Sequence, residues 1–192
     1  MSNLTKTYDD ILTVAQSLIV AAGYNGFSYA DVAEKIGIRK ASIHHHFPNK
    51  ADLIRTLVVR YRGAAEAGIA QVEREVAGPL AQLRAYIGYW ERCIGDDSSP
   101  FCLCALLATQ VSVLPEEVGE AVRAHFESFA AWLASVLERG ARIGQFRLSG
   151  PPHAEAEMIL ATVHGAMLSA RAYGDPKIFG VVTGALLERY AT

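Results

Sequence analysis

Polar side chains gather in a short stretch near the N-terminus. Five of them lie within seven residues: Arg39, Lys40, Ser42, His44 and His45. Guanidinium and ammonium groups bind phosphates and base edges, and hydroxyl and imidazole groups can add further polar contacts. Ala41 and Ser42 are short, so a helix that carries this stretch could come close to a groove. The stretch therefore indicates contact with nucleic acid, although an ordinary solvated helix face has a similar composition.

The flanking residues predict the elements that would present this stretch. Ser28 is followed by Asp31 three residues later, which is the capping-box pattern at the start of a helix. Gly37 ends that helix, because glycine readily adopts the left-handed conformation found after a helix C-terminus. A second short helix is expected from Arg39 to His46. Two short helices, 28–36 and 39–46, joined by a tight turn with a glycine are the signature of a helix-turn-helix.

The rest of the chain is also predicted to be helical. A first helix is expected to begin at Thr7 and to carry an apolar stripe from Ile11 to Ala22. Asn49, with Asp52 three residues later, is expected to cap a long helix that could reach Val76. Further helices are expected from Pro79, within the apolar segment 101–113, from Pro115, and over about 153–173 and 176–190.

The residues around the predicted turn have a specific resemblance. The run His46-Phe47-Pro48-Asn49-Lys50-Ala51-Asp52-Leu53, with the residues before it from Ile11 onward, resembles the N-terminal domain of the TetR family of transcriptional regulators. The resemblance covers about residues 9–58. It implies an all-α fold of about nine helices. A three-helix helix-turn-helix DNA-binding domain over residues 1–50 would be followed by a helical effector-binding and dimerisation domain over residues 51–192.

The resemblance also implies which residues read the DNA. Arg39 and Lys40 match the start of the recognition helix, where base edges are reached. Ser42 matches a residue that faces the groove. His45 joins this set because it lies among the polar side chains of the same helix.

Three more residues are expected to meet the DNA backbone. Ser28 matches a residue that caps the second helix and touches a phosphate, and Lys50 matches a lysine that contacts phosphate from the start of the fourth helix. His44 departs from the family pattern, because it stands where the family usually has a tyrosine that contacts the backbone. A histidine can still donate to a phosphate, but such a contact depends on pH, because the unperturbed pKa of an imidazole is about 6.5.

Composition and charge are those of a globular protein with an uneven charge distribution. The chain is 51% hydrophobic and 20% charged, and its net charge of −2 excludes a globally basic coat protein for nucleic acid. Residues 1–60 carry a net charge of +2 and the remaining residues carry −4. A positive N-terminal part favours contact with a polyanion, but chance scatter would produce the same difference.

No membrane span or secretion signal is expected. The uncharged runs 11–30 and 98–115 are interrupted by glycines or bounded by prolines, so we interpret both as soluble, buried helical segments. The three cysteines are an odd number and fit a reducing cytoplasm rather than a disulfide scaffold. The predicted location is therefore the cytoplasm.

No catalytic residue, metal site or cofactor is expected. The sequence has no nucleophile elbow, Walker loop, dinucleotide fingerprint or His-Glu-x-x-His pattern. The consecutive histidines 44–46 would point in three directions on a helix, because successive residues are about 100° apart. Cys102 and Cys104 would lie about 200° apart, which disfavours a shared metal or a mutual disulfide. A free cysteine is commonly a small buried apolar residue, but a reactive thiol at Cys102 or Cys93 is the alternative.

The last two helices contain small residues at a spacing of four. They are Ala161, Gly165, Ser169, Gly180 and Gly184. Such residues let helices approach closely, either within one chain or between two subunits. The resemblance favours the second interpretation, which predicts a homodimer that binds a palindromic operator in double-stranded DNA.

Apolar and aromatic residues of the C-terminal part could line an effector pocket. They are Tyr86, Trp90, Cys93, Cys102, Phe126, Phe129, His164 and Met167. A stripe of this kind is often simply core, but the resemblance favours a pocket for a small apolar or aromatic effector.

These observations predict a ligand-responsive dimeric DNA-binding regulator, a repressor released from its operator by its effector. Two alternatives stay open at this point. One is a helical protein-interaction module without DNA binding, and the other is a regulator that senses electrophiles or oxidants through a thiol. The sequence contains nothing that names the operator, the effector or the regulated genes.

Overall fold

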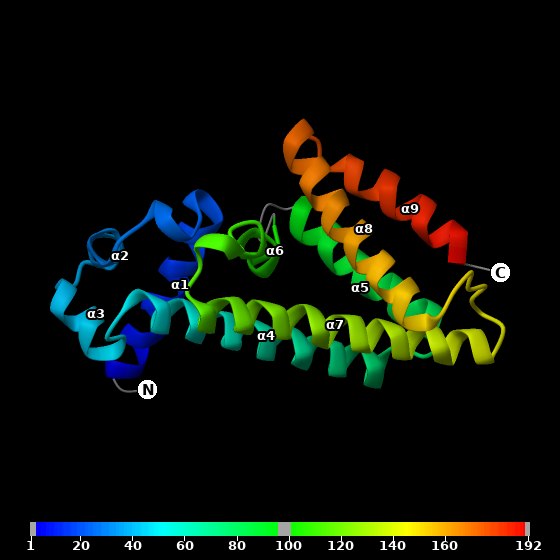
Figure 1. Cartoon of the computed structure of the whole chain (residues 1–192), viewed down its shortest axis with the longest axis horizontal. Coiled ribbons are helices and arrows are strands. Elements are labelled where there is room, and N and C mark those ends of the chain that lie inside the picture. The colour runs from blue at the N-terminus through cyan, green and yellow to red at the C-terminus, as the bar shows by residue number, and fades with distance from the viewer. Residues whose placement is uncertain (1–2, 96–100, 191–192) are drawn as a thin grey trace. The chain divides into compact units, whose positions relative to one another are not determined.

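The regular elements found in the described part of the chain are all helices. The computed structural model describes residues 3–95 and 101–190. Their α-helices are α1 (Asn3–Ala22), α2 (Tyr29–Ile36), α3 (Lys40–His46), α4 (Lys50–Glu75), α5 (Pro79–Gly95), α6 (Leu103–Ala108), α7 (Glu116–Arg142), α8 (Pro152–Tyr173) and α9 (Lys177–Tyr190) (Figure 1). Two single turns of 3-10 helix are η1 (Tyr24–Gly26) and η2 (Val111–Val113). The predicted all-α fold with about nine helices is confirmed for the described residues.

The helix starts follow local hydrogen bonding. Ser28 and Asp31 form the predicted capping box of α2, and Gly37 ends this helix in the left-handed conformation. The Asp52 amide donates to Asn49 Oδ1 over 2.9 Å at the start of α4. The start predicted at Thr7 is wrong, because α1 already begins at Asn3. Residues 3–6 contain no proline or glycine, so nothing in them stops the helix from extending.

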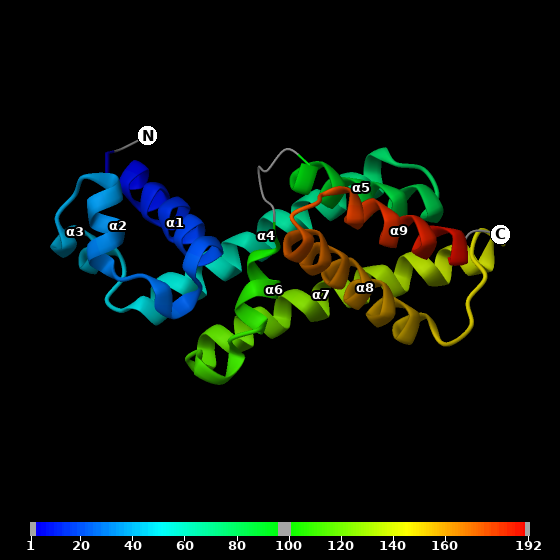
Figure 2. The same ribbon diagram turned by 90° about the horizontal axis from the view of Figure 1, so that it is seen from above.

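The chain forms two compact units. The first unit consists of the chain up to Gly63 together with Leu103–His125, and so contains α1 to α3, α6, η2 and the first parts of α4 and α7. Within it α1 packs on α2 and α6, and α2 packs on α3 (Figure 2). Its core includes the fully buried side chains of Ile11, Ile19, Val32, Ile43 and Leu53. The predicted helix-turn-helix thus belongs to a unit that also includes a segment distant in sequence.

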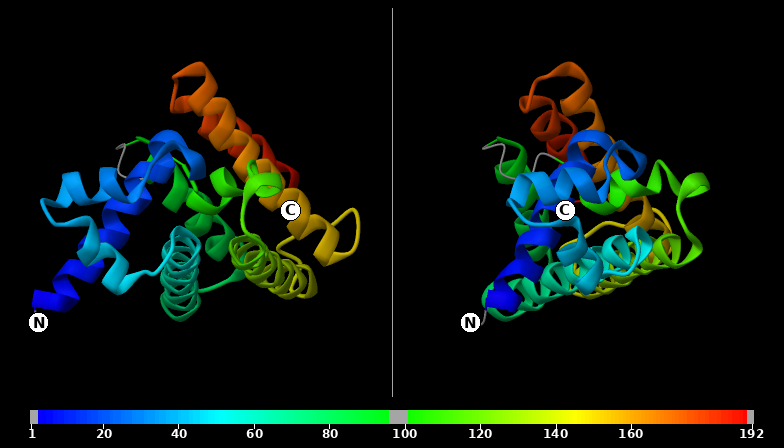
Figure 3. Two further views of the ribbon diagram at one scale, coloured as in Figure 1. Left: turned by 60° about the vertical axis from the view of Figure 1, so that its left-hand side comes forward. Right: turned by 90° about the vertical axis from the view of Figure 1, so that its left-hand side faces the viewer.

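The second unit consists of Ala64–Cys102 and the chain from Phe126 onward. Helices α8 and α9 lie side by side, and α5 packs on α9 (Figure 3). Gly174, with φ 64°, ends α8 in the left-handed conformation and lets the chain reverse into α9. The core of this unit includes Leu83, Leu133, Val163, Met167 and Phe179, which are fully buried.

A buried carboxylate anchors the end of α9 in the second unit. Glu155 on α8 is buried and accepts a hydrogen bond from the Tyr190 hydroxyl and another, over 3.0 Å, from the Ser149 amide. The Arg147 amide donates to the Tyr190 carbonyl over 3.1 Å. The loop before α8 and the last turn of α9 are therefore joined through polar groups that each have a partner.

None of the helices in residues 3–95 and 101–190 is both long enough and apolar enough to cross a membrane.

Candidate DNA-binding site

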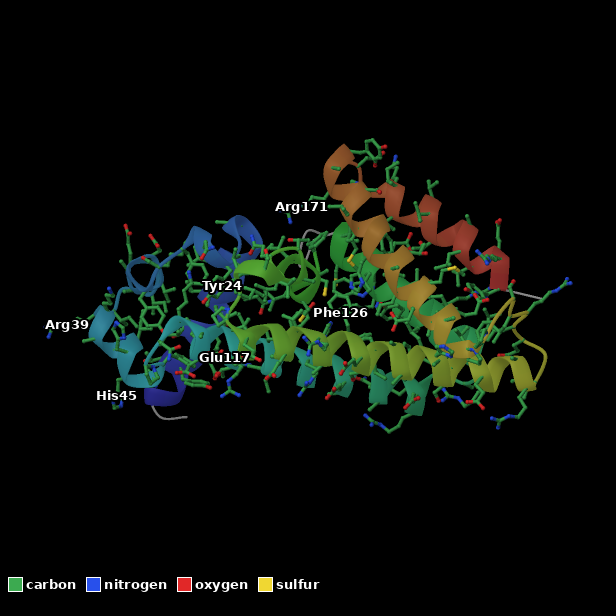
Figure 4. All side chains as sticks on the ribbon, in the orientation of Figure 1. Tyr24, Arg39, His45, Glu117, Phe126 and Arg171 are labelled. Carbon is green, nitrogen blue, oxygen red and sulfur yellow. The ribbon has the colours of Figure 1, made fainter. Side chains whose placement is uncertain are left out.

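The helix pair α2–α3 presents most of the predicted DNA-binding residues on its surface. Arg39 is the N-cap of α3, and Arg39 and Lys40 are exposed, as is Ala41. Ser42 is half-buried, and Ile43 is the buried residue of the helix. The side chains of Arg39 and His45 extend away from the ribbon (Figure 4). Because α3 is anchored through an apolar residue, the exposed side chains of Arg39, Lys40 and His45 are available to a partner.

Ser28 is engaged in its own helix cap. Its backbone amide donates to Asp31 Oδ2 over 2.6 Å, its hydroxyl donates to the same oxygen over 2.8 Å, and the Ala30 amide donates to the hydroxyl over 3.2 Å. The hydrogen bonds from the Ser28 hydroxyl and amide lower the pKa of the Asp31 carboxyl. The hydroxyl proton is thus already directed to a carboxylate, so a phosphate would have to compete for it.

The three consecutive histidines occupy three different environments. The Nδ1 atom of His44 lies 3.2 Å from the Pro48 carbonyl oxygen. Its ring meets the Tyr29 ring edge to face, with 4.9 Å between centroids. His45 is exposed, and His46 is half-buried against Tyr8, with 5.9 Å between ring centroids. Among the described residues, no group of three histidine, cysteine or carboxylate side chains is arranged to hold a metal ion.

Lys50 has a different environment from the one that a phosphate contact requires. Its ammonium donates to the Phe27 carbonyl and lies 4.0 Å from the centroid of the Phe27 ring and 4.9 Å from that of Tyr24. Burial lowers the pKa of Lys50, and the Asp31 carboxylate opposes this effect. In this structure Lys50 therefore tethers the start of α4 to the segment between α1 and α2, and its contact with DNA remains a prediction.

The same segment is held by a residue that sequence reasoning missed. Gln110, in the turn after α6, accepts a hydrogen bond from the Tyr24 amide over 2.8 Å. Burial raises the pKa of the Tyr24 hydroxyl, and the nearby Glu117 carboxylate raises it further. Gln110 and Glu117 follow Tyr24 by more than eighty residues, so no local pattern in the sequence connects them. The segment that leads into the helix-turn-helix is thus held by Gln110, from the turn after α6, within the first unit.

The predicted pocket residues all belong to the second unit. Tyr86 is buried between Phe129 and Trp132, with ring centroids 5.9 Å and 5.7 Å apart, and burial raises the pKa of its hydroxyl. Phe126 and His164 are both half-buried, with 5.1 Å between ring centroids. A surface hollow of about 310 Å³ in this unit is lined by other residues: Gly78, Pro79, Gln82, Arg139, Arg142 and Ile143. Tyr86, Phe129 and Trp132 therefore form an aromatic cluster, Phe126 and His164 form a ring pair, and the use of these residues as an effector pocket remains a prediction.

All three cysteines are buried. Cys102 and Cys104 are both 0% exposed, and Cys93 is 9% exposed. Their burial fits the interpretation of the cysteines as small apolar residues, and the alternative of a reactive thiol at Cys102 or Cys93 remains a prediction. The side chain of Cys102 packs in the interior beside the aromatic cluster, where its charge would raise the pKa of Tyr86.

The small residues of α8 and α9 have unequal surroundings. A Cβ atom added to Gly165 or Gly184 would meet no other atom within 4 Å, whereas one added to Gly180 would lie 3.0 Å from Glu91 Oε1 on α5. Ala161 is exposed, and Ser169 is half-buried. Large apolar side chains are exposed on the same two helices: Met158 (36%), Leu168 (57%), Tyr173 (75%) and Val181 (68%).

Family models match both parts of the chain. The model described as "Bacterial regulatory proteins, tetR family" matches residues 11–57, and the one described as "Tetracyclin repressor-like, C-terminal domain" matches residues 79–186. The chain belongs to the TetR family. A TetR family transcriptional regulator from Agrobacterium tumefaciens, known as a crystal structure, is 57% identical and has a TM-score of 0.97. The match covers 99% of this chain and 100% of that one.

Two relatives of the chain are named as transcriptional regulators, one as a repressor and one as an activator. The HTH-type transcriptional repressor NemR of Escherichia coli is 20% identical over 169 residues, which are 86% of this chain and 84% of NemR. The HTH-type transcriptional activator FasR of Mycolicibacterium smegmatis is 25% identical over 120 residues, which are 58% of this chain and 55% of FasR. The chain is a transcriptional regulator with a helix-turn-helix and not an enzyme.

Proposed function

We propose that this chain is a homodimeric repressor that binds a palindromic operator through α3 and is released by a small effector. Regulators of the TetR family bind operator DNA and small-molecule effectors and are typically dimers. The observation that carries the proposal is the exposed polar surface of α3, where Arg39 and Lys40 stand at the start of a helix anchored by Ile43. Such a regulator acts where the DNA is, in the cytoplasm.

The decisive experiment is binding to duplex DNA from the region upstream of the chain's own gene. Arg39→Ala and Lys40→Ala should each weaken specific binding by about 1–3 kcal/mol, which is the value of one base contact. Arg84→Ala, an exposed arginine on α5, is the matched control and should leave binding unchanged. Wild-type affinity in both α3 variants would show that this helix does not read the operator.

Lys50 needs a separate design because it is tethered inside the first unit. A lysine that contacts one phosphate should, when replaced, reduce the slope of binding affinity against salt by about one. Lys50→Met keeps most of the aliphatic chain that packs on Phe27 and Tyr24 and removes the charge. A lower salt slope with an unchanged melting temperature supports a phosphate contact, and a lower melting temperature alone supports a purely internal role.

The dimer is proposed to form through the exposed faces of α8 and α9. Met158, Ala161, Gly165 and Leu168 recur at helical spacing on α8, and all four are exposed. On α9, Val181 lies one turn before Gly184, and both are accessible. An exposed apolar face of this length is unusual for a monomer and suits a second copy of the chain. Two recognition helices could then reach half-sites about 34–36 Å apart.

The effector is proposed to be a small apolar or aromatic molecule that binds at the aromatic cluster of the second unit. Tyr86, Phe129 and Trp132 provide ring faces there, with few polar groups. To lower operator affinity a hundredfold, the effector must favour the DNA-incompetent state by about 2.7 kcal/mol, and operator must weaken effector binding by the same factor. Calorimetric titration of a candidate compound with and without saturating operator tests this, and equal affinities would exclude that compound as the inducer.

The thiol-sensing alternative has less support, because all three cysteines are buried. Alkylation of the native protein followed by peptide mass mapping distinguishes a thiol sensor from a regulator that binds a small effector. Rapid modification of Cys93 together with loss of operator binding would favour a thiol sensor.

The sign of regulation is tested with a reporter gene behind the operator. NemR is a repressor and FasR an activator, so the relatives support either sign. We expect expression of the reporter to rise when the gene for this chain is deleted.

A further inference from the structure

The hydrogen bond of His44 to the turn after α3 fixes which of its ring nitrogens carries a proton. His44 is exposed on α3, and its Nδ1 atom lies 3.2 Å from the Pro48 carbonyl oxygen. A carbonyl oxygen only accepts hydrogen bonds, so Nδ1 must be the donor. A neutral imidazole has a single ring proton, and here it is on Nδ1.

This tautomer determines what the outward nitrogen can do. In neutral His44, Nε2 has a lone pair and no proton, so it cannot donate to a phosphate oxygen. In the imidazolium form both nitrogens donate, so the ring can keep its bond to Pro48 and also donate from Nε2. The added charge also strengthens a hydrogen bond to a phosphate.

We propose that His44 contacts a backbone phosphate of bound DNA only as an imidazolium, so that DNA binding takes up a proton at this residue. The inference rests on the proposed function, because it requires α3 to lie against DNA. It adds that operator affinity rises as the pH falls across the range in which histidines titrate, between about pH 8 and pH 6. If operator binding takes up one proton, the operator affinity changes by at most about tenfold per pH unit.

The ionisable groups around His44 lie on α2 and on α3 itself. Tyr29 on α2 meets the ring, and burial, with a contribution from the Asp52 carboxylate on α4, raises the pKa of Tyr29 to about 12. Tyr29 therefore stays neutral over this range. On α3 itself, the ionisable side chains nearest to His44 are those of Lys40, about one turn before it, and of His45, next to it, and both are exposed.

The test compares four proteins by fluorescence anisotropy on the duplex from upstream of the gene, between about pH 6 and pH 8 at constant ionic strength. The wild type should bind several-fold more tightly at the lower pH. His44→Gln and His44→Tyr provide a neutral donor, so both should lose most of this dependence. His45→Gln, the matched control on the same helix, should retain it.

Three outcomes would overturn the inference. They are binding independent of pH in the wild type, an unchanged pH dependence in His44→Gln, and a loss of the dependence in His45→Gln alone. A second readout is independent of DNA: long-range nitrogen–proton correlation spectra of the free protein should show His44 with its proton on Nδ1 at the higher pH, and a proton on Nε2 would contradict the argument. Absence of sequence-dependent binding at every pH would instead refute the proposed function.

Discussion

Replacing Gly23 with alanine should destabilise the first unit strongly, because two independent features of this position exclude a side chain. The backbone has φ 75° and ψ −176°, a region that is populated essentially by glycine alone. A Cβ atom built on Gly23 would also lie 2.3 Å from Gln110 Nε2 and 2.9 Å from Gln110 Oε1. The same carboxamide accepts the hydrogen bond of the Tyr24 amide, so it cannot move without losing that bond.

The magnitude follows from these two features. A residue held in a sparsely populated backbone region costs about 1–3 kcal/mol. Displacing Gln110 removes a hydrogen bond to a partly buried amide, which costs about 1 kcal/mol more. Gly23→Ala should therefore lower the free energy of unfolding by about 2–4 kcal/mol, which corresponds to a fall in melting temperature of roughly 4–16 °C for a chain of this size.

Urea unfolding of three single variants and one double variant provides the assay. Gly37→Ala is the matched control: it also replaces a glycine of positive φ, 76°, but no atom lies within 4 Å of the added Cβ. It should therefore cost only the left-handed strain of about 1–2 kcal/mol. Gln110→Ala removes the obstacle, so the double variant with Gly23→Ala should lose less than the sum of the two single losses. Equal costs at Gly23 and Gly37, or strict additivity, would refute this account of the contact.

Three further predictions concern other parts of the molecule. Tyr190→Phe should lower the free energy of unfolding by about 1–3 kcal/mol, because the buried Glu155 carboxylate loses its hydroxyl donor; a loss below about 0.5 kcal/mol in urea unfolding would contradict the anchor. The pKa of Asp31 is lowered in the folded protein, so its stabilising effect is complete above the pKa of the unfolded chain and is lost as the pH falls through the lower, folded value. Wild-type stability should consequently fall more than that of Asp31→Asn on acidification below about pH 5, and parallel curves would disagree with this. Gly165→Leu should weaken the dimer, as measured by sedimentation. Gly68→Leu is the control and should leave the dimer unchanged, because Gly68 is also an exposed helical glycine with no atom within 4 Å of an added Cβ. A wild-type monomer at micromolar concentration would exclude the interface.

Much of the site could be predicted from the sequence because its determinants are local. The start of α2 depends on Ser28 and Asp31, and that of α4 on Asn49 and Asp52, which interact across three residues. Backbone hydrogen bonds in a helix span four residues, so the periodicity of apolar residues was sufficient to find nearly every helix. At Thr7 the local signal failed, because a residue that can cap a helix is also tolerated inside one.

The sequence by itself therefore determined the all-α fold, the helix-turn-helix and the polar residues of α3, since all of these depend on hydrogen bonds and spacings within a few residues. Tertiary structure alone decided the partners of these residues. Lys50 reaches Phe27 across 23 residues, and Gln110 reaches the Tyr24 amide across 86. Burial of Cys102 and the contact of Gly180 with Glu91 likewise depend on which helices pack together. Such contacts form only when distant segments share one core, and the order of residues along the chain does not encode that proximity in any short pattern.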